Sequence, residues 1–202
     1  MFIQLIQGKT ANPDGLRAAV DRWQRELAPG ATGWLGSTGG TAADGRFFAA
    51  VRFESTEAAR RNSDRPEQGA WWAETEKLFT GPVTFRESTD VTIDQQGDPD
   101  QATFVQVMQG HSSDPERSRQ LMDQDSDKWA AFRPDVLGTV NVGLPDGDFA
   151  MIMYFTSETD AREGESKELP LELRATMDEL TKLGTGEPTF IDLKNPVLRS
   201  PS

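Results

Sequence analysis

Two glutamines within apolar stretches are the side chains best placed to take part in chemistry. Gln4 lies in residues 2–8 (FIQLIQG), and Gln106 lies in residues 104–110 (FVQVMQG). A buried amide without a hydrogen-bond partner costs about 1–3 kcal/mol, so two such amides suggest a role in binding or catalysis. The alternative interpretation is that each amide is held by neighbouring backbone groups. We take both glutamines as candidate catalytic residues, and Gln4 also as a candidate ligand-binding residue.

His111, the single histidine of the chain, is the third candidate for catalysis. A neutral imidazole can accept a proton near neutral pH. Ser112, Ser113 and Asp114 follow it, which predicts a polar loop and favours a solvated histidine. The chain has no cysteine, so disulfides, thiolate metal sites and cysteine nucleophiles are excluded, and one histidine cannot form a His-x-x-x-His zinc helix. We therefore expect no metal site.

The tryptophans form a second group of candidate ligand-binding residues. Trp23, Trp34, Trp71 and Trp72 all lie in the first half of the chain, whereas Trp129 is alone in the second half. Tryptophan offers a large apolar surface and one donor, which suits a flat aromatic pocket. The alternative is that tryptophans at helical spacing belong to the core. If only one half keeps a pocket, this asymmetry favours the first half.

The two glutamine stretches begin a tandem repeat. Residue 2 corresponds to residue 104, and the same offset of 102 residues aligns identities far along the chain. They include Gln4/Gln106, Gln7/Gln109, Gly8/Gly110, Pro13/Pro115, Arg17/Arg119, Asp21/Asp123, Gly36/Gly138, Phe53/Phe155, Ser55/Ser157 and Arg60/Arg162. Near the end Phe85 aligns with Phe190, an offset of 105, which a short insertion in the second copy explains. A fixed offset over such a length predicts one structural unit built twice.

Each copy shows the element order βαββαβ, the ferredoxin-like unit. In the first copy we expect strands at residues 2–8, 31–40, 46–53 and 83–93, with helices over residues 12–29 and 55–80, the latter broken near Pro66. Asp44 and Gly45 supply the turn between the middle strands. The second copy repeats this scheme, so the predicted class is α+β.

The predicted domain boundaries follow from the repeat and from composition. The first unit covers residues 1–93 and the second covers residues 102–193. Residues 94–101 (DQQGDPDQ) are polar and rich in turn formers, which predicts a linker. Residues 194–202 contain two prolines and two serines, which is typical of a loose tail.

The charge of the chain limits its partners. A formal net charge of −12 argues against nucleic acid and against an anionic membrane surface, because both need a Lys/Arg footprint. The N-terminus lacks the basic region and long apolar run of a signal peptide, and no later segment resembles a membrane span. We expect a cytoplasmic protein that binds neither nucleic acid nor membranes.

The first strand of each copy is apolar on both faces, which one helical layer cannot cover. Phe2 and Ile6 share one face of the first copy, while Ile3 and Leu5 share the other. Packing the two bare sheet faces together would bury them in a barrel-like core. We expect a monomeric pseudo-dimer of this kind, and its further homo-oligomerisation stays open.

This duplicated βαββαβ pattern, with a double-sided first strand and an Asp-Gly hairpin, resembles the dimeric α/β-barrel superfamily, in particular its antibiotic-biosynthesis-monooxygenase-like branch. The resemblance covers the chain through residue 193. It implies an intramolecular dimeric α/β-barrel. The activities it implies include oxygenation without a cofactor, haem degradation and lactone isomerisation, and some members have no known activity.

The resemblance also assigns roles to residues. A polar amide of the first strand, commonly asparagine, points into the pocket between sheet and helices in the resembled oxygenases, and Gln4 and Gln106 match that position. In the haem-degrading relatives the axial histidine lies on the second helix. Residues 60–79 and 162–183 contain no histidine, so haem is disfavoured and we expect no cofactor.

Two functional hypotheses follow. The first is a small-molecule-binding protein that resembles cofactor-independent monooxygenases acting on apolar or aromatic substrates. The second is a non-catalytic ligand-binding or structural module, in which the duplication serves to complete the α/β-barrel. An enclosed cavity beside Gln4 would favour the first hypothesis, whereas a filled interior would favour the second.

Overall fold

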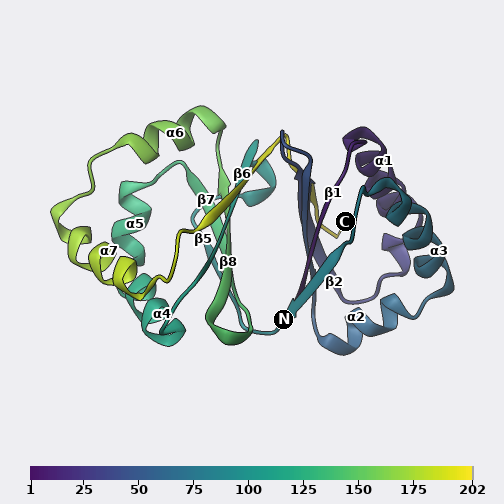
Figure 1. Cartoon of the computed structure of the whole chain (residues 1–202), viewed down its shortest axis with the longest axis horizontal. Helices are drawn as coiled ribbons and strands as arrows, with labels where there is room; N and C mark the ends of the chain where they lie inside the picture. The colour runs from purple at the N-terminus through teal and green to yellow at the C-terminus, as the bar shows by residue number, and fades with distance from the viewer. Residues whose placement is uncertain (202) are drawn as a thin grey trace. The chain divides into compact units, whose positions relative to one another are not determined.

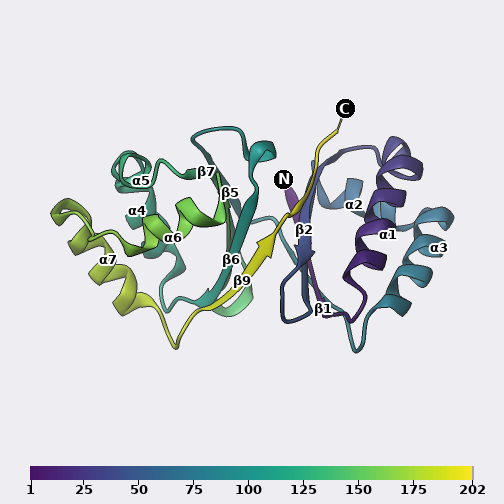
Figure 2. The same ribbon diagram turned by 90° about the horizontal axis from the view of Figure 1, so that it is seen from above.

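The repeated first strands lie near the centres of two antiparallel sheets in the computed structural model, which describes residues 1–201. One compact unit comprises Met1–Val91 together with the stretch that begins at Leu193, and the other comprises Thr92–Asp192. Each unit has a five-stranded sheet with helices on one face (Figures 1 and 2). The predicted α+β class with tandem ferredoxin-like repeats is therefore confirmed.

The first unit follows the predicted order closely. Its elements are β1 (Phe2–Lys9), α1 (Pro13–Glu26), β2 (Trp34–Thr41), β3 (Arg46–Phe53), α2 (Thr56–Ser63), α3 (Pro66–Thr75) and β4 (Thr84–Ser88), with short 3₁₀ turns at Ala28–Gly30 and Glu76–Leu78. The sheet order is β10-β2-β3-β1-β4. Strand β1 thus pairs with β3 on one side and with β4 on the other.

The second unit repeats the scheme. Its elements are β5 (Val91–Gln95), β6 (Phe104–His111), α4 (Pro115–Gln124), α5 (Ser126–Phe132), β7 (Val136–Gly143), β8 (Asp148–Phe155), α6 (Glu158–Ser166), α7 (Leu171–Leu183) and β9 (Thr189–Lys194), with 3₁₀ turns at Pro99–Gln101 and Pro145–Gly147. The sheet order is β5-β7-β8-β6-β9. Strand β10 (Val197–Arg199) completes the first sheet rather than this one.

The helix caps and the hairpin turns repeat at equivalent positions of the two units, because similar residues form them. Asn12 caps α1 and Asp114 caps α4, each through its side chain and each before a proline. The predicted hairpin turns contain Gly45 with φ of 81° and Gly147 with φ of 87°, a conformation that glycine adopts without a steric penalty. The register also repeats, since Phe2 faces Phe53 as Phe104 faces Phe155.

The predicted strand over residues 83–93 is wrong as a single element. The chain turns after Ser88, whose Oγ accepts a hydrogen bond from the Asp90 N–H at 3.0 Å. Strand β4 before the turn belongs to the first sheet, and β5 after it belongs to the second. The predicted linker over residues 94–101 is also not entirely a loop, because its first two residues belong to β5, which reaches Gln95. The N–H groups of Gln96 and Gly97 then donate to the Leu137 carbonyl at 3.1 and 2.8 Å.

The prediction of a loose tail over residues 194–202 is wrong for its middle part. Strand β10 pairs with β2, and the Val197 side chain is buried. The Arg199 guanidinium donates to Asp21 at 2.5 Å, and Arg17 donates to the Asn195 carbonyl. The composition of this segment predicted a tail, but its backbone groups and Val197 find partners on a strand that is remote in sequence.

Both faces of the first strands are buried, as the sequence predicted. On the helix-facing side Phe2 packs in a cluster with Trp23 and Phe53. On the opposite side Ile3 and Leu5 are fully buried. The equivalent Val105 and Val107 of β6 are also fully buried. The shared barrel-like core that this pattern suggested stays a prediction. Within residues 1–201, no helix combines the length and apolarity that crossing a bilayer requires.

We predict that removing β10 destabilises the protein although the strand is short. A chain that ends at Asn195 loses the buried Val197, the Arg199–Asp21 ion pair and the backbone bonds to β2. We expect a loss of about 2 kcal/mol or more, measured as a lower urea midpoint, because burial of one valine alone is worth roughly 1.5–3 kcal/mol. A chain that ends at Ser200 is the control. Equal midpoints for both truncations would contradict a structural role for β10.

We also predict that residues 1–98 do not form a stable monomer. This fragment lacks β10, which leaves the edge of β2 open, and its own β5 has no β7 to pair with. Sedimentation equilibrium is expected to show dimers or larger species. If the shared core exists, calorimetry of the intact chain shows one cooperative transition. A monomeric fragment that melts like the whole chain would contradict the shared core. It would also contradict the structural roles of β10 beside β2 and of β7 beside β5.

Candidate functional site

The two glutamines occupy equivalent positions and each donates to a carboxylate on the last strand of its repeat. Gln4 lies on the helix-facing side of β1, opposite Glu87 of β4, and its Nε2 donates to Glu87 Oε1 at 2.9 Å. In the second unit Gln106 Nε2 donates to Asp192 Oδ1 at 3.0 Å. The partners are therefore side chains rather than the backbone groups considered above. Glu87 and Asp192 are aligned by the offset of 105, which is the signal that could have identified them.

In the second unit an arginine locks this pair. Arg162 of α6 binds the other carboxylate oxygen of Asp192, and it also contacts Glu165 at 3.0 Å. Its guanidinium lies over the Phe104 ring, 5.2 Å from the centroid. The pKa of Arg162 is raised, because Glu165 accepts its hydrogen bond and Asp192 adds a second negative charge. Gln106, which is 6% exposed, therefore belongs to a closed network.

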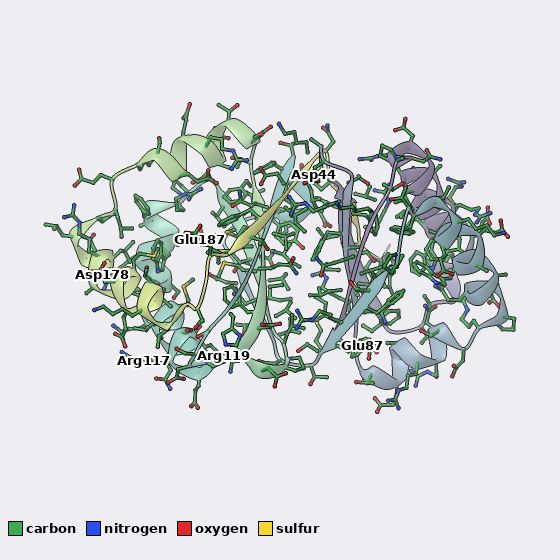
Figure 3. All side chains as sticks on the ribbon, in the orientation of Figure 1. Asp44, Glu87, Arg117, Arg119, Asp178 and Glu187 are labelled. Atoms are coloured by element: carbon green, nitrogen blue, oxygen red, sulfur yellow. The ribbon has the colours of Figure 1, made fainter. Side chains whose placement is uncertain are left out.

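The first unit lacks this lock although it has an arginine at the equivalent position. Arg60 aligns with Arg162 but is exposed. Residues equivalent to the glutamates that anchor Arg162 are absent, since Ser63 aligns with Glu165 and Thr56 with Glu158. Within the described part of the chain no ion pair joins Arg60 to Glu87. Glu87, labelled in Figure 3, is exposed, and among residues 1–201 its side chain hydrogen-bonds with Gln4 alone.

Three of the four predicted tryptophans belong to the core of the first unit. Trp23 and Trp34 are buried and meet edge to face, with centroids 5.1 Å apart. Their indole N–H groups donate to Gln68 at 2.7 Å and to Ser37 at 3.0 Å. Trp71 is half-buried, and its N–H donates to the Ala19 carbonyl at 2.9 Å. All three donors thus already have partners within the protein.

Trp72 has a different environment from the other three. Its ring meets Phe85 edge to face, with centroids 5.2 Å apart, and lies 6.2 Å from Phe79. Phe85, on the edge strand β4, is 45% exposed, so this aromatic group reaches the surface. Phe85 pairs with Ile6 of β1, two residues from Gln4 on the same face. The structure therefore brings Trp72 to the side of the sheet that carries Gln4 and Glu87.

The centre of this sheet face is only partly covered. Ile6, Ala49 and Val51 are half-buried on the helix-facing side, whereas Leu5 and Ala50 on the opposite side are buried. The second unit shows the same contrast, since Met108, Met151 and Met153 of its helix-facing side are half-buried. Solvent therefore reaches the middle of the helix-facing surface in both units.

A hollow of about 300 Å³ lies between α1 and the end of α3 in the first unit. Its walls include Gly15, Ala19 and Arg22 on one helix and Glu74 on the other. A second hollow, of about 460 Å³, lies beside α6 in the second unit. Neither hollow is lined by Gln4, by Gln106 or by any of the four tryptophans.

In the second unit an ion pair bridges the position that is hollow in the first. Arg117 of α4 aligns with Gly15, and Glu179 of α7 aligns with Glu74. The Arg117 guanidinium donates to both carboxylate oxygens of Glu179, at 2.7 and 3.0 Å. The pKa of Glu179 is lowered, because Arg117 donates to it. Helices α4 and α7 are thus clamped together, and the corresponding helices of the first unit are not joined in this way.

His111 is not in a loop and is not close to Gln106. It is the last residue of β6, where its Nδ1 lies 3.1 Å from Asp148 Oδ1 on the neighbouring strand. Its side chain is 39% exposed. Five residues separate it from Gln106, which places them about 17 Å apart and on opposite faces of the strand. The prediction of a polar loop is wrong here, because the backbone of residue 111 pairs with Asp148.

Within residues 1–201 no three histidine, aspartate or glutamate side chains are grouped so that they could hold a metal ion. The buried Asp125 of the second unit has protein partners instead. Its carboxylate accepts hydrogen bonds from Lys128 at 2.5 Å and from Thr176 of α7. Asp125 and Thr176 align with Trp23 and Trp71, so a polar pair replaces two tryptophans between the helices.

Comparison with solved structures identifies the fold. A candidate monooxygenase from Lactobacillus acidophilus NCFM is 12% identical, with a TM-score of 0.75 over 98% of this chain and 95% of that one. A candidate monooxygenase from Fusobacterium nucleatum is 10% identical, with a TM-score of 0.76 over 98% and 94%. The chain shares the duplicated ferredoxin-like fold of these structures.

A third solved structure, of an anthrone oxidase-like protein, is 13% identical, with a TM-score of 0.70 over 98% of this chain and 92% of that one. No family model and no curated protein matches the sequence. The TM-scores establish a shared fold, and because the identities are low the activity has to be argued from the residues.

We predict that Asp125 makes the protein sensitive to acid. The pKa of Asp125 is lowered, first because Lys128 donates to the carboxylate and then because Thr176 does. A lowered folded-state pKa gives stability that is complete above the unfolded-state pKa, near pH 4, and is lost as the pH falls through the folded value. Urea unfolding between pH 7 and pH 2.5 is therefore expected to show an Asp125→Asn deficit that shrinks below about pH 4. The exposed Asp127→Asn is the control, and a deficit that stays constant with pH would contradict the prediction.

Proposed function

We propose that this protein binds an apolar or aromatic small molecule on the helix-facing side of its first unit, in the manner of cofactor-independent monooxygenases. The observation that carries the proposal is the half-buried sheet surface around Gln4. Ile6 and Val51 there are half-buried, and Trp72 with the exposed Phe85 supplies an aromatic edge. A flat apolar ligand could cover this surface and gain both burial and ring contacts.

The first unit is the better host because it lacks two clamps that the second unit has. The Arg117–Glu179 pair ties α4 to α7, and the Arg162–Asp192 pair ties α6 to β9. Gly15 replaces the first of these arginines, and the exposed Arg60 replaces the second. Of these two pairs only Arg162–Asp192 joins a helix to the sheet, and the first unit has a helix–sheet pair of its own between Asp21 of α1 and Arg199 of β10. The advantage of the first unit is local. Within residues 1–201 no ion pair joins Arg60 to Glu87, so a ligand beside Gln4 would not have to break one there.

We further propose that the protein promotes oxidation of the bound ligand by dioxygen. This proposal is supported by the resemblance noted from the sequence and by the likeness to structures described as monooxygenases and as anthrone oxidase-like. Electron-rich hydroxyaromatic rings are the suited class, because dioxygen can oxidise such rings without a bound metal or cofactor. Gln4 would then orient the ring through the Gln4 carbonyl oxygen, because Gln4 Nε2 already donates to Glu87.

A non-catalytic module is the second candidate function, and specific observations favour it. The N–H groups of Trp23, Trp34 and Trp71 are all satisfied inside the protein, as expected for core residues. The two hollows lie away from Gln4. In this alternative the duplicated fold supplies a stable scaffold, and any bound ligand leaves unchanged.

We predict that polycyclic phenols and quinols bind the intact chain and quench its tryptophan fluorescence. Trp72→Ala is expected to weaken binding about two- to tenfold, because a lost aromatic pair is worth roughly 0.5–1.5 kcal/mol. The matched control is Met177→Ala, which truncates the equivalent residue of the second unit.

Oxygen uptake in the same samples separates the two functions. Consumption that depends on ligand and protein supports oxidation, and binding without consumption supports the non-catalytic module. Failure of every ligand to bind would contradict the proposal altogether. A larger effect of Met177→Ala than of Trp72→Ala would place the site in the second unit.

A further inference from the structure

We infer that Glu87 makes the first unit selective for ligands that present a neutral hydroxyl group. The second unit lacks this selectivity because Arg162 pairs with Asp192, the residue equivalent to Glu87. The inference rests on the proposed function for the position of the ligand. The two amide–carboxylate pairs differ in what surrounds the carboxylate, and this difference determines which chemical group of a ligand each unit recognises.

The Glu87 carboxylate has unused hydrogen-bonding capacity. A carboxylate offers about four acceptor positions, and the contact with Gln4 Nε2 at 2.9 Å uses one of them. Across residues 1–201 no cationic side chain pairs with Glu87. The group lies on the same sheet face as Gln4 and, two residues away on β4, as Phe85. A ring that lies against Phe85 and Trp72 would thus bring its substituents close to a bare carboxylate.

Asp192 lies at the equivalent position of the second unit, but both of its oxygens already accept hydrogen bonds from protein donors. One oxygen accepts from Gln106 at 3.0 Å, and the other binds the Arg162 guanidinium. Arg162 is itself fixed by Glu165 and by the Phe104 ring. The negative charge of Asp192 is therefore neutralised locally, and its oxygens are directed at protein donors.

The chemistry of the Glu87 carboxylate determines which ligand it selects. A ligand hydroxyl donates a charge-assisted hydrogen bond to it, which is stronger than a bond between neutral groups. A methyl ether of the same ring has no proton to donate. A carboxylate or phenolate on the ring would meet a like charge with no cation to compensate it. The preferred ligand class is consequently a neutral hydroxyaromatic compound, with its hydroxyl directed at Glu87 and Gln4.

Three probes that share one ring system test this inference on the intact chain at pH 7. 2-Naphthol donates a hydrogen bond, 2-methoxynaphthalene does not, and 2-naphthoate carries a negative charge. For the natural chain, calorimetric titration is expected to give affinities in that order, with about a tenfold step from naphthol to the ether. Glu87→Gln should weaken naphthol several-fold and tighten naphthoate about two- to fivefold, because Glu87 is exposed and its charge is screened, with the ether unchanged. Glu87→Asp retains the charge and should keep the original order.

Asp192→Asn is the matched control in the second unit. It is expected to leave the order of the three probes unchanged. Circular dichroism spectra and melting curves verify that each variant is folded. If none of the probes binds the natural chain, the proposed function fails. If they bind but Glu87→Gln leaves their relative affinities unchanged, this inference is overturned while ligand binding stands. A change of order in Asp192→Asn rather than in Glu87→Gln would also overturn it, because selection would then occur in the second unit.

Discussion

The pairing of the first strand of each repeat on both of its edges is the constraint on which the other features depend. Strand β1 lies between β3 and β4, and this position fixes which of its residues face the helices. Alternation along a strand then places Phe2 and Gln4 on the helix side and Ile3 on the other side. The same pairing sets Gln4 opposite Glu87, so the amide–carboxylate pair is a consequence of sheet register.

Duplication has kept this scaffold and changed what covers it. In the first unit tryptophans fill the space between α1 and α3, and their donors are satisfied locally. In the second unit Asp125 and Thr176 occupy those positions and hydrogen-bond to each other. The second unit has thus exchanged apolar burial for polar bonds, which stabilise only when every partner is present.

Ion pairs show the same divergence. Arg117 and Arg162 tie helices to their neighbours in the second unit through carboxylates that both units possess at equivalent positions. In the first unit the matching Glu74 and Glu87 are exposed, and Glu74 pairs with Lys77 of the 3₁₀ turn that follows α3, at 2.7 Å. The difference lies in the arginines and their anchors rather than in the acids. A single glycine at position 15 is enough to prevent one of the two clamps.

The sequence by itself determined the repeat, the element order, the helix caps, the turn glycines and the double-sided first strands. These features arise from residues that are close along the chain, where period and turn chemistry are directly visible. It also indicated Gln4 and Gln106 as equivalent amides, because the offset of 102 residues aligns them.

Only the tertiary structure decided which strands complete each sheet and which side chains meet at the glutamines. Strands β5 and β10 pair with strands that are remote in the chain. Backbone groups are the same in every residue, so the sequence of a strand does not indicate which other strand it pairs with. Arg162 and Arg60 are the same residue type at equivalent positions, yet one binds the carboxylate and the other is exposed. Alignment of the two copies shows that Glu158 and Glu165, which pair with Arg162 along its helix, are Thr56 and Ser63 in the first copy. Only the fold shows that Glu87 and Asp192 lie beside the two glutamines, because these contacts join strands that are remote in the sequence.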